Sequence, residues 1–206
     1  MNDLMSLGLH RTWKREFINL INLNSNDLVL DLASGSGDLT KIIKEKSNCK
    51  CVVYDSSIEM IDEAKKKLDS ENLFFLCGQA ENLPFKNEIF DYVVVGFGLR
   101  NFSDVEKSIR EIYRVLKKGG GFFCLEFSEI NNIFLRKAFN LYSKIIPIYG
   151  GVFLNNKVAY SYLVQSIKHF PNQIELTKKL QKSGFANIEA IDILNGLASI
   201  HISKKK

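Results

Sequence analysis

The chain contains few of the residues on which disulfides and metal centres depend. Of its 206 residues, four are cysteines and three are histidines. The cysteines lie in or beside apolar, strand-like runs and form no C-x-x-C pair: Cys49, Cys51, Cys77 and Cys124. The histidines are far apart and lack an accompanying ligand pattern: His10, His169 and His201. We therefore expect buried, reduced thiols, a reducing compartment and no metal site.

Long apolar runs and a secretory leader are also missing. The longest apolar stretch, Ile145–Leu154, contains Pro147 and two glycines and is well below the roughly 20 residues that span a bilayer. The first six residues lack a basic segment followed by an apolar core. These features predict a cytoplasmic protein. Contact of the 145–154 stretch with the inner face of a membrane, or with a greasy ligand, is a hypothesis.

No single basic block is present, although the formal net charge is +5. The lysines are scattered along the chain, as expected for solvated helix faces, so we predict no nucleic-acid partner. With 46% hydrophobic and 25% charged residues, the chain is long enough for one sizeable core and too short for two ordinary α/β domains. We expect a single domain over residues 1–206.

Apolar runs of strand length alternate with amphipathic stretches, which predicts a parallel sheet covered on both faces by helices. Seven strands are expected, at Leu28–Asp31, Cys51–Tyr54, Leu73–Cys77, Tyr92–Val95, Gly121–Phe127, Ile188–Ile193 and Leu197–Ser203. Helices are expected at Leu39–Lys46, Ile58–Leu68, Val105–Leu116, Phe134–Ile146, Val158–His169 and Gln173–Ser183, the last ending at Gly184. The final two strands are close enough to form an antiparallel hairpin.

The segment Leu28–Asp38 is an apolar run that ends in a carboxylate and continues into a loop of glycine and serine. This pattern is typical of a buried strand that enters a nucleotide-binding turn, where glycines allow the backbone to approach a ligand. A dinucleotide site needs a third glycine, and Thr40 stands there instead. Asp55 ends the next strand, 18 residues after Gly37, where a carboxylate can accept both ribose hydroxyls.

The acid at Asp55 alone fits NAD as well as S-adenosylmethionine, and the rest of the chain discriminates. Gln79–Glu81 follows the third apolar run, an acid-then-apolar strand begins at Phe90, and Leu116–Gly121 precedes a fifth strand. This ordered set resembles the class I S-adenosylmethionine-dependent methyltransferases. The resemblance implies a Rossmann-like α/β fold with a mostly parallel seven-stranded sheet and an antiparallel C-terminal strand.

More specific blocks extend over essentially the whole chain. They are residues 1–15, the G-F-G-L-R-N block at Gly96–Asn101, Tyr113–Lys117, the C-L-E-F-S block at Cys124–Ser128, Tyr160–Leu163 and Ser166–Ile167. Together they resemble the ubiquinone/menaquinone biosynthesis C-methyltransferase family. In that family the acceptor is a polyprenylated benzoquinol, of the 2-methoxy-6-polyprenyl-1,4-benzoquinol type, or demethylmenaquinol, and a ring carbon is methylated. These two precursors stay open here.

The resemblance implies a set of cofactor-binding positions for S-adenosylmethionine. They are Asp31, Gly35, Ser36, Gly37, Asp55, Met60, Gln79, Ala80 and Gly96. Asp31 either orients the glycine loop or meets the amino-acid end of the cofactor. Gly96 stands where the family commonly has serine, so one hydroxyl near the methyl donor is absent.

Three residues are candidates for the chemistry. A ring carbon becomes a good nucleophile once a neighbouring hydroxyl loses its proton, so the protein must align the reactants and stabilise negative charge without a metal. Arg100 is the preferred electrostatic stabiliser, because arginine stays protonated. The alternative is a surface salt bridge to Asp104 or Glu126. Asn101 and Tyr160 are weaker candidates for holding a ring oxygen.

Residues 128–172 exceed a simple crossover, so we expect an insert that covers the active site. Family members carry a few dozen residues before the M-N-D-L-M-S block, whereas here Met1 begins it. Either Met1 is internal to a longer reading frame or the cofactor site is open. Two alternatives to a quinol C-methyltransferase therefore remain: a methyltransferase for another small aromatic or lipid, and a catalytically weak scaffold that binds other quinone-biosynthesis enzymes. The oligomeric state is not predicted.

Overall fold

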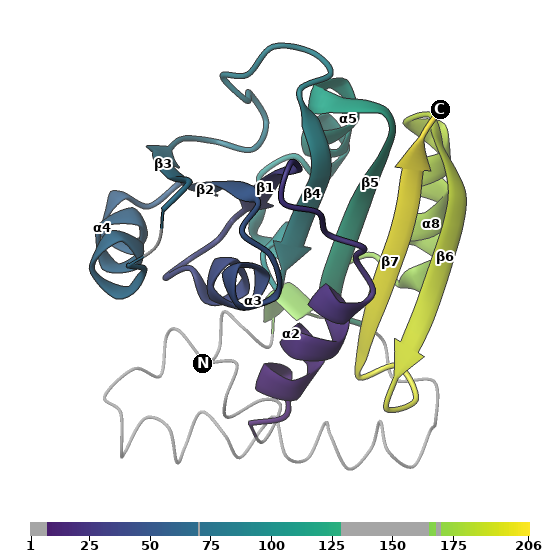
Figure 1. The fold of residues 1–206 in the computed structure, drawn as a ribbon. Coiled ribbons are helices and arrows are strands. Elements are labelled where there is room, and N and C mark those ends of the chain that lie inside the picture. The colour runs from purple at the N-terminus through teal and green to yellow at the C-terminus, as the bar shows by residue number, and fades with distance from the viewer. Residues whose placement is uncertain (1–7, 70, 129–164, 168–169) are drawn as a thin grey trace.

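The computed structural model describes residues 8–69, 71–128, 165–167 and 170–206 (Figure 1). The predicted helix at 134–146, the apolar stretch at 145–154 and Tyr160 lie outside these ranges. Most of the predicted 158–169 helix does too, although 165–167 is helical. The expected insert can therefore be followed only at its two ends.

Seven strands form one sheet, in the order β3-β2-β1-β4-β5-β7-β6. Their bounds are β1 Leu28–Leu32, β2 Lys50–Asp55, β3 Leu73–Cys77, β4 Phe90–Gly96, β5 Leu116–Phe127, β6 Phe185–Ile193 and β7 Ala198–Lys205. The first five strands are parallel, and β7 runs antiparallel between β5 and β6. The predicted fold class and the antiparallel final strand are confirmed.

The strand order reverses between β1 and β4, because β2 and β3 extend the sheet on one side and β5 extends it on the other. In open α/β sheets ligands bind beyond the carboxyl ends of the strands at such a reversal. The loops that follow β1 and β4 are therefore the places to look for a site.

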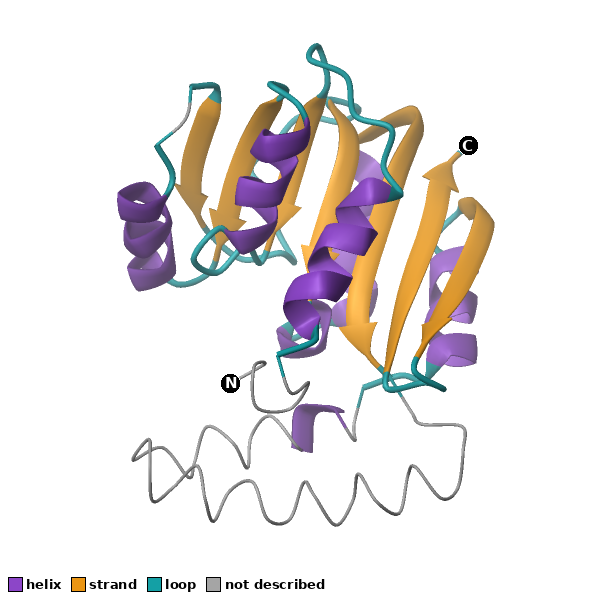
Figure 2. Ribbon diagram, turned by 60° about the horizontal axis from the view of Figure 1, so that its bottom comes forward, coloured by secondary structure: helices purple, strands orange, loops and turns teal. Residues whose placement is uncertain are grey.

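Besides the helical residues 165–167, five α-helices and one 3₁₀ turn, η1 (Leu99–Asn101), accompany the sheet in the described residues. The helices are α2 His10–Asn19, α3 Asp38–Lys46, α4 Ile58–Lys67, α5 Val105–Val115 and α8 Gln173–Lys182. Figure 2 shows α2, α3 and α4 on one face of the sheet and α5 and α8 behind it. Each face thus encloses its own apolar core, as the sequence pattern predicts.

Helix α5 shows why these segments are helical. Ser108, Ile109, Ile112 and Val115 are fully buried and recur at the spacing of one helix face. Asp104 caps the N-terminus of the helix, because its carboxylate accepts a hydrogen bond from the backbone N–H of Lys107 at 2.9 Å.

Helix α2 is absent from the sequence-based prediction. It buries Trp13 and Phe17 against the sheet, one helical turn apart. Leu9 at its start makes no side-chain capping bond, so the usual start signal is missing. The i, i+4 aromatic pair is the signal that could have revealed it.

Two further expectations need correction. Strand β5 begins at Leu116, so Gly119–Gly121 lie within it and do not precede it. The pairing with β4 is irregular there, as in a β-bulge. A side chain on Gly120 would lie 2.8 Å from the backbone oxygen of Lys117, so glycine is needed at this position. Cys49, Cys51 and Cys124 are buried as predicted, whereas Cys77 is exposed because it ends the edge strand β3.

Within the described part of the chain, no helix is long and apolar enough to cross a membrane. The same residues include no group of three or more histidine, cysteine, aspartate or glutamate side chains placed to hold a metal ion.

Candidate active site

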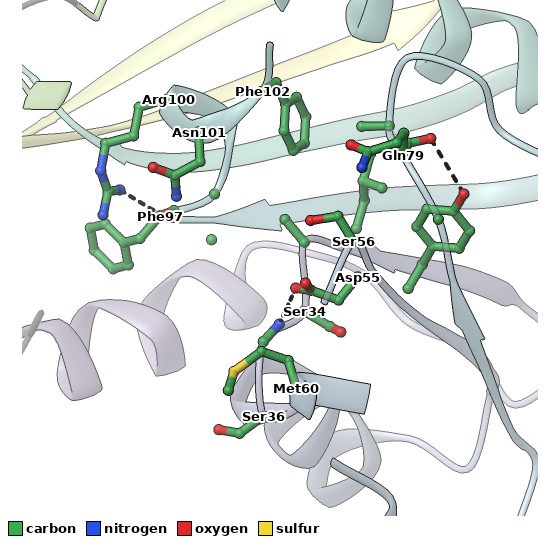
Figure 3. Close-up of a pocket in the computed structure, with 18 of the residues that line it drawn as sticks. Ser34, Ser36, Asp55, Ser56, Met60, Gln79, Phe97, Arg100, Asn101 and Phe102 are labelled. Atoms are coloured by element: carbon green, nitrogen blue, oxygen red, sulfur yellow. Dashed lines mark hydrogen bonds between the residues drawn. The ribbon is translucent and has the colours of Figure 1, made fainter. Parts of the chain in front are cut away.

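A cavity of about 460 Å³ opens beyond the carboxyl ends of β1, β2, β3 and β4 (Figure 3). Its walls are the loop after β1, the end of β2 at Asp55, the segment Gly78–Glu81 and the loop Gly96–Phe102. Lys14 and Met60 contribute from α2 and α4. The site thus lies at the reversal of strand order, as the topology predicts.

The loop after β1 has an unusual backbone. Ala33, Gly35 and Gly37 all have positive φ, at 56°, 55° and 80°. Glycine accepts this conformation easily, but alanine does so at a cost of about 1–2 kcal/mol. A non-glycine residue held in this region is typical of functional sites, where the surrounding structure maintains the strain.

Asp55 fixes this loop from the neighbouring strand. Its Oδ2 accepts a hydrogen bond from the backbone N–H of Gly35 at 2.8 Å, and its Oδ1 accepts one from Ser57 at 2.9 Å. Each carboxylate oxygen can accept a second hydrogen bond. The side chain also lines the cavity, so Asp55 can orient the loop and receive ligand hydroxyls together.

Asp31 lies beneath the loop and is fully buried. Its Oδ2 accepts hydrogen bonds from Thr40 Oγ1 at 2.6 Å and Thr40 N at 3.0 Å. Burial raises the pKa of Asp31 to about 6, although the Thr40 bonds and the charge of Lys14 oppose the rise. These bonds join Asp31 to the first turn of α3, directly after the loop, and both roles expected for Asp31 stay predictions.

The far end of the cavity is formed by Gln79 and Ala80. Tyr54 Oη donates a hydrogen bond to the backbone oxygen of Gln79 at 3.3 Å, and Ala80 is 4% exposed. A side chain on Gly78 would meet Tyr54 Oη at 2.2 Å. This wall is therefore closely packed, and it offers both polar and apolar groups to a flat ring such as an aromatic base.

The loop after β4 forms the opposite wall. Phe97, like Ala33, is a non-glycine residue with positive φ, at 59°, and it also lines the cavity. At Gly96 an added Cβ would lie 2.7 Å from Leu39 Cδ1, so Leu39 fills the space that a serine side chain would need. Packing of Leu39 against Gly96 is therefore consistent with glycine, and not serine, at this position.

Arg100 projects from η1 and lines two cavities. Its Nη1 donates to the backbone oxygen of Phe97 at 2.6 Å and forms an ion pair with Glu126. The two side chains are 5% and 0% exposed. The predicted alternative, a salt bridge from Arg100 to Glu126, therefore forms, but it is buried and not on the surface. The second cavity, of about 350 Å³, is lined by Arg100, Phe102, Val105, Gln165, Ser166, Phe170 and Pro171.

Most of the predicted site residues meet at the larger cavity. Those that line it are Gly35, Ser36, Asp55, Met60, Gln79, Ala80, Gly96, Arg100 and Asn101 (Figure 3). Asp31 and Gly37 are not in its lining: Asp31 belongs to β1, and Gly37 is the last loop residue before α3. Tyr160 lies outside the described residues. Sequence reasoning missed Lys14, Phe97 and Phe102 as lining residues.

The residues present fit S-adenosylmethionine. Asp55 offers acceptor positions for ribose hydroxyls, and the Gln79–Ala80 wall suits adenine. The cavity volume lies within the usual range for small-molecule sites.

Solved structures confirm the fold. An S-adenosylmethionine-dependent methyltransferase from Thermotoga maritima matches with a TM-score of 0.68 and 19% identity, over 95% of this chain and 89% of that one. Phosphoethanolamine N-methyltransferase 2 from Haemonchus contortus, solved with S-adenosyl-L-methionine, matches with a TM-score of 0.73 and 14% identity, over 94% of this chain and 52% of that one. The fold is that of the class I S-adenosylmethionine-dependent methyltransferases.

Sequence comparison is more specific. A model of the ubiE/COQ5 methyltransferase family matches residues 1–205, and the chain belongs to that family. Ubiquinone/menaquinone biosynthesis C-methyltransferase UbiE from Rickettsia prowazekii is 44% identical over all of this chain and 86% of the relative. The protein of the same description from Methylococcus capsulatus is 39% identical over 98% of this chain and 84% of the relative.

Proposed function

We propose that the chain transfers a methyl group from S-adenosylmethionine to a ring carbon of a polyprenylated benzoquinol or demethylmenaquinol. The observation that carries the proposal is the pair of cavities that share Arg100 and Phe102. One cavity has the features of a nucleoside site. The other adjoins it and is lined largely by apolar side chains, which suits a quinol ring.

S-adenosylmethionine, when bound, supplies an electrophilic methyl group on a sulfonium. The chain must then hold the ring carbon beside that group and favour loss of the hydroxyl proton. Arg100 keeps its positive charge and lies at the wall between the cavities, so it can stabilise a developing phenolate. Asn101 lines the larger cavity beside it, where its amide can hold a ring oxygen.

The ion pair with Glu126 fixes the orientation of the Arg100 guanidinium. It takes part of the guanidinium's donor capacity, but an arginine has five N–H donors. Held by Glu126 and by the backbone oxygen of Phe97, Arg100 is pre-oriented at the wall between the two cavities. Proton removal is therefore assigned to a water or another group that Arg100 orients, and not to Arg100 itself.

Titration calorimetry with S-adenosylmethionine tests the cofactor half of the proposal. We expect micromolar binding by the wild-type chain, loss of binding for Asp55→Ala, and unchanged binding for the control Asp62→Ala on the exposed surface of α4. Absence of binding by the wild-type chain would contradict the enzyme function and favour the scaffold alternative.

Turnover assays test the acceptor half. A short-chain prenylated benzoquinol and a demethylmenaquinol, both kept reduced, are incubated with radiolabelled S-adenosylmethionine. Methyl transfer to either ring, lost in Arg100→Ala but with cofactor binding retained, supports the proposal. Transfer only to unrelated aromatic or lipid acceptors would contradict it.

A polyprenylated acceptor resides in a membrane, so the proposal includes peripheral contact of the chain with the cytoplasmic face of the membrane. Flotation with lipid vesicles that contain the reduced acceptor tests this point. Recovery of all the protein in the soluble fraction would count against it.

A further inference from the structure

Two cationic side chains line the larger cavity among the described residues, Arg100 and Lys14. Arg100 is engaged by Glu126. Lys14 comes from α2, and its side chain is 12% exposed. An ammonium group so nearly buried at a cavity wall needs anionic partners.

The partner that the structure shows is Asp38, the first residue of α3. Lys14 Nζ lies 2.9 Å from Asp38 Oδ2, and Lys67 of α4 bonds to the other oxygen, Oδ1. Two ammonium groups therefore share one carboxylate. If Lys14 binds another anion, Asp38 keeps Lys67 as its partner.

A buried carboxylate, that of Asp31, lies behind the glycine loop near Lys14. Asp31 is close enough for the charge of Lys14 to affect its ionisation. Its Oδ2 is bonded to Thr40, whereas its buried Oδ1 has no hydrogen-bond partner among the described residues. At the cavity wall itself, the Lys14 ammonium complements an anionic group of a ligand.

Ser36 shows that the Lys14 side of the cavity lies beside the glycine loop. Its hydroxyl oxygen lies 3.4 Å from Lys67 Nζ, and it belongs to the loop that Asp55 fixes at Gly35. Asp55 and the Gln79–Ala80 wall suit the nucleoside. The Lys14 wall is therefore left for the zwitterionic amino-acid end of the cofactor.

We propose that Lys14 binds the α-carboxylate of S-adenosylmethionine. This inference rests on the proposed function and adds a cofactor-binding residue from α2, a segment remote in sequence from the glycine loop. No proton or bond is exchanged in this step: Lys14 binds the carboxylate while Asp38 remains paired with Lys67.

The test compares ligands that differ only at this end. S-adenosylhomocysteine retains the amino-acid group, whereas 5′-methylthioadenosine keeps the adenosine and the thioether sulfur but has none. For Lys14→Gln we expect S-adenosylhomocysteine to bind about 10- to 100-fold more weakly, the size of one lost charged hydrogen bond. Binding of 5′-methylthioadenosine should stay within about twofold of wild type.

Lys67→Gln is the matched control, because Lys67 bonds to the same carboxylate but is not in the cavity lining. Because Lys67→Gln leaves Asp38 to be neutralised by Lys14, we expect it to weaken S-adenosylhomocysteine less than Lys14→Gln does, and to leave 5′-methylthioadenosine close to wild type. Equal weakening of S-adenosylhomocysteine by the two variants would overturn the inference, since Lys14 would then act only by organising Asp38. Weakening of both ligands by Lys14→Gln would overturn it too.

These outcomes are distinct from failure of the proposed function. If the wild-type chain binds none of these nucleosides, the proposed function itself fails, and this inference fails with it. If the wild-type chain binds S-adenosylhomocysteine and Lys14→Gln binds it equally well, only the role of Lys14 is overturned. Circular dichroism of each variant establishes that the comparison is between folded proteins.

Discussion

Arg100 and Glu126 are joined by a buried ion pair that connects the loop after β4 to strand β5. Glu126 Oε2 accepts a hydrogen bond from the backbone N–H of Arg100 at 3.3 Å, and Oε1 is paired with its guanidinium. The centroid of the Phe127 ring lies 5.4 Å from Arg100 Cζ. One glutamate thus fixes both the backbone and the side chain of the residue proposed to stabilise the substrate.

Glu126→Gln should destabilise the chain, because it leaves the Arg100 guanidinium buried beside a neutral amide. Loss of one partner of a buried ion pair typically costs about 3–5 kcal/mol. Urea unfolding measures the change. The control Glu106→Gln removes a partly exposed glutamate that pairs with Lys179 and Lys182, and it should have much less effect. Similar midpoints for the two variants would argue against the importance of the buried pair.

Asp31 should make stability fall as pH rises. Its pKa is about 6 in the folded chain and 3.8 as the ordinary value, so the folded state binds the proton more tightly. The contribution is fully present below pH 3.8 and is lost as pH passes through about 6. Asp31→Asn should remove this dependence, so its stability relative to wild type should rise by roughly 2 kcal/mol from pH 4 to 7. Denaturant unfolding at several pH values measures it.

Asp38 should make stability change with pH in the opposite direction to Asp31, and the same unfolding experiment measures it. Burial favours its neutral form, but the bonds from Lys67 and Lys14 outweigh this effect and lower its pKa to about 2. Its stabilising contribution is present above pH 3.8 and is lost as pH falls through about 2. Asp38→Asn should therefore lose stability relative to wild type as the pH increases from 2 to 4. Parallel slopes for Asp31→Asn and Asp38→Asn would refute the assignment.

Gly98 and Gly96 should differ sharply in their tolerance of alanine. A Cβ at Gly98 would lie 2.6 Å from Ala33 Cβ, an atom fixed by the strained loop after β1. A Cβ at Gly96 meets the end of the Leu39 side chain, which can rotate. We expect Gly98→Ala to cost about 1–3 kcal/mol and to weaken S-adenosylmethionine binding, and Gly96→Ala to cost less. Thermal unfolding and calorimetry on both variants decide the point, and the reverse order would contradict it.

Lys205 should stabilise the end of the sheet despite its position in the last strand. The side chain is 8% exposed, and its Nζ donates to the backbone oxygens of Leu116 at 2.8 Å and Arg114 at 3.3 Å. Lys205→Met removes these bonds and should cost about 1–3 kcal/mol. The neighbouring, exposed Lys204 gives the control Lys204→Met, for which little change is expected. Equal unfolding temperatures for the two variants would show that the bonds add nothing.

The fold was predictable wherever apolar periodicity and turn residues agree. Strand β3 matches its predicted bounds, and the hairpin between β6 and β7 turns through Leu194, Asn195 and Gly196, all with positive φ. Bounds were missed where tertiary pairing extends an element, as in β5, whose first residues form a strand only because β4 lies beside them. Helix α2 was missed because its stability comes from packing of Trp13 and Phe17 and not from a capping signal.

The site was predictable where ligand contacts follow directly after a strand. Asp55 and Gln79 are examples, because the carboxyl ends of parallel strands meet at one edge of the sheet. Lys14 could not be found in this way, since only the packing of α2 against α3 brings it to the cavity. The positive φ of Ala33 and Phe97 has no sequence signature, because neighbouring strands hold both loops: Ser34 N–H donates to Tyr54 O at 3.1 Å, and Phe97 N–H donates to Leu125 O at 2.7 Å.

The position of β7 between β5 and β6 also constrains the order in which the chain can fold. In the part of the chain that the structure describes, strand β6 pairs with the sheet only through β7, so its partner becomes available when the residues from Ala198 onward are present. The five parallel strands and both loops of the site precede it in sequence. During synthesis, the cofactor-binding half can therefore form first, with the edge of β5 exposed until the hairpin arrives to cover it.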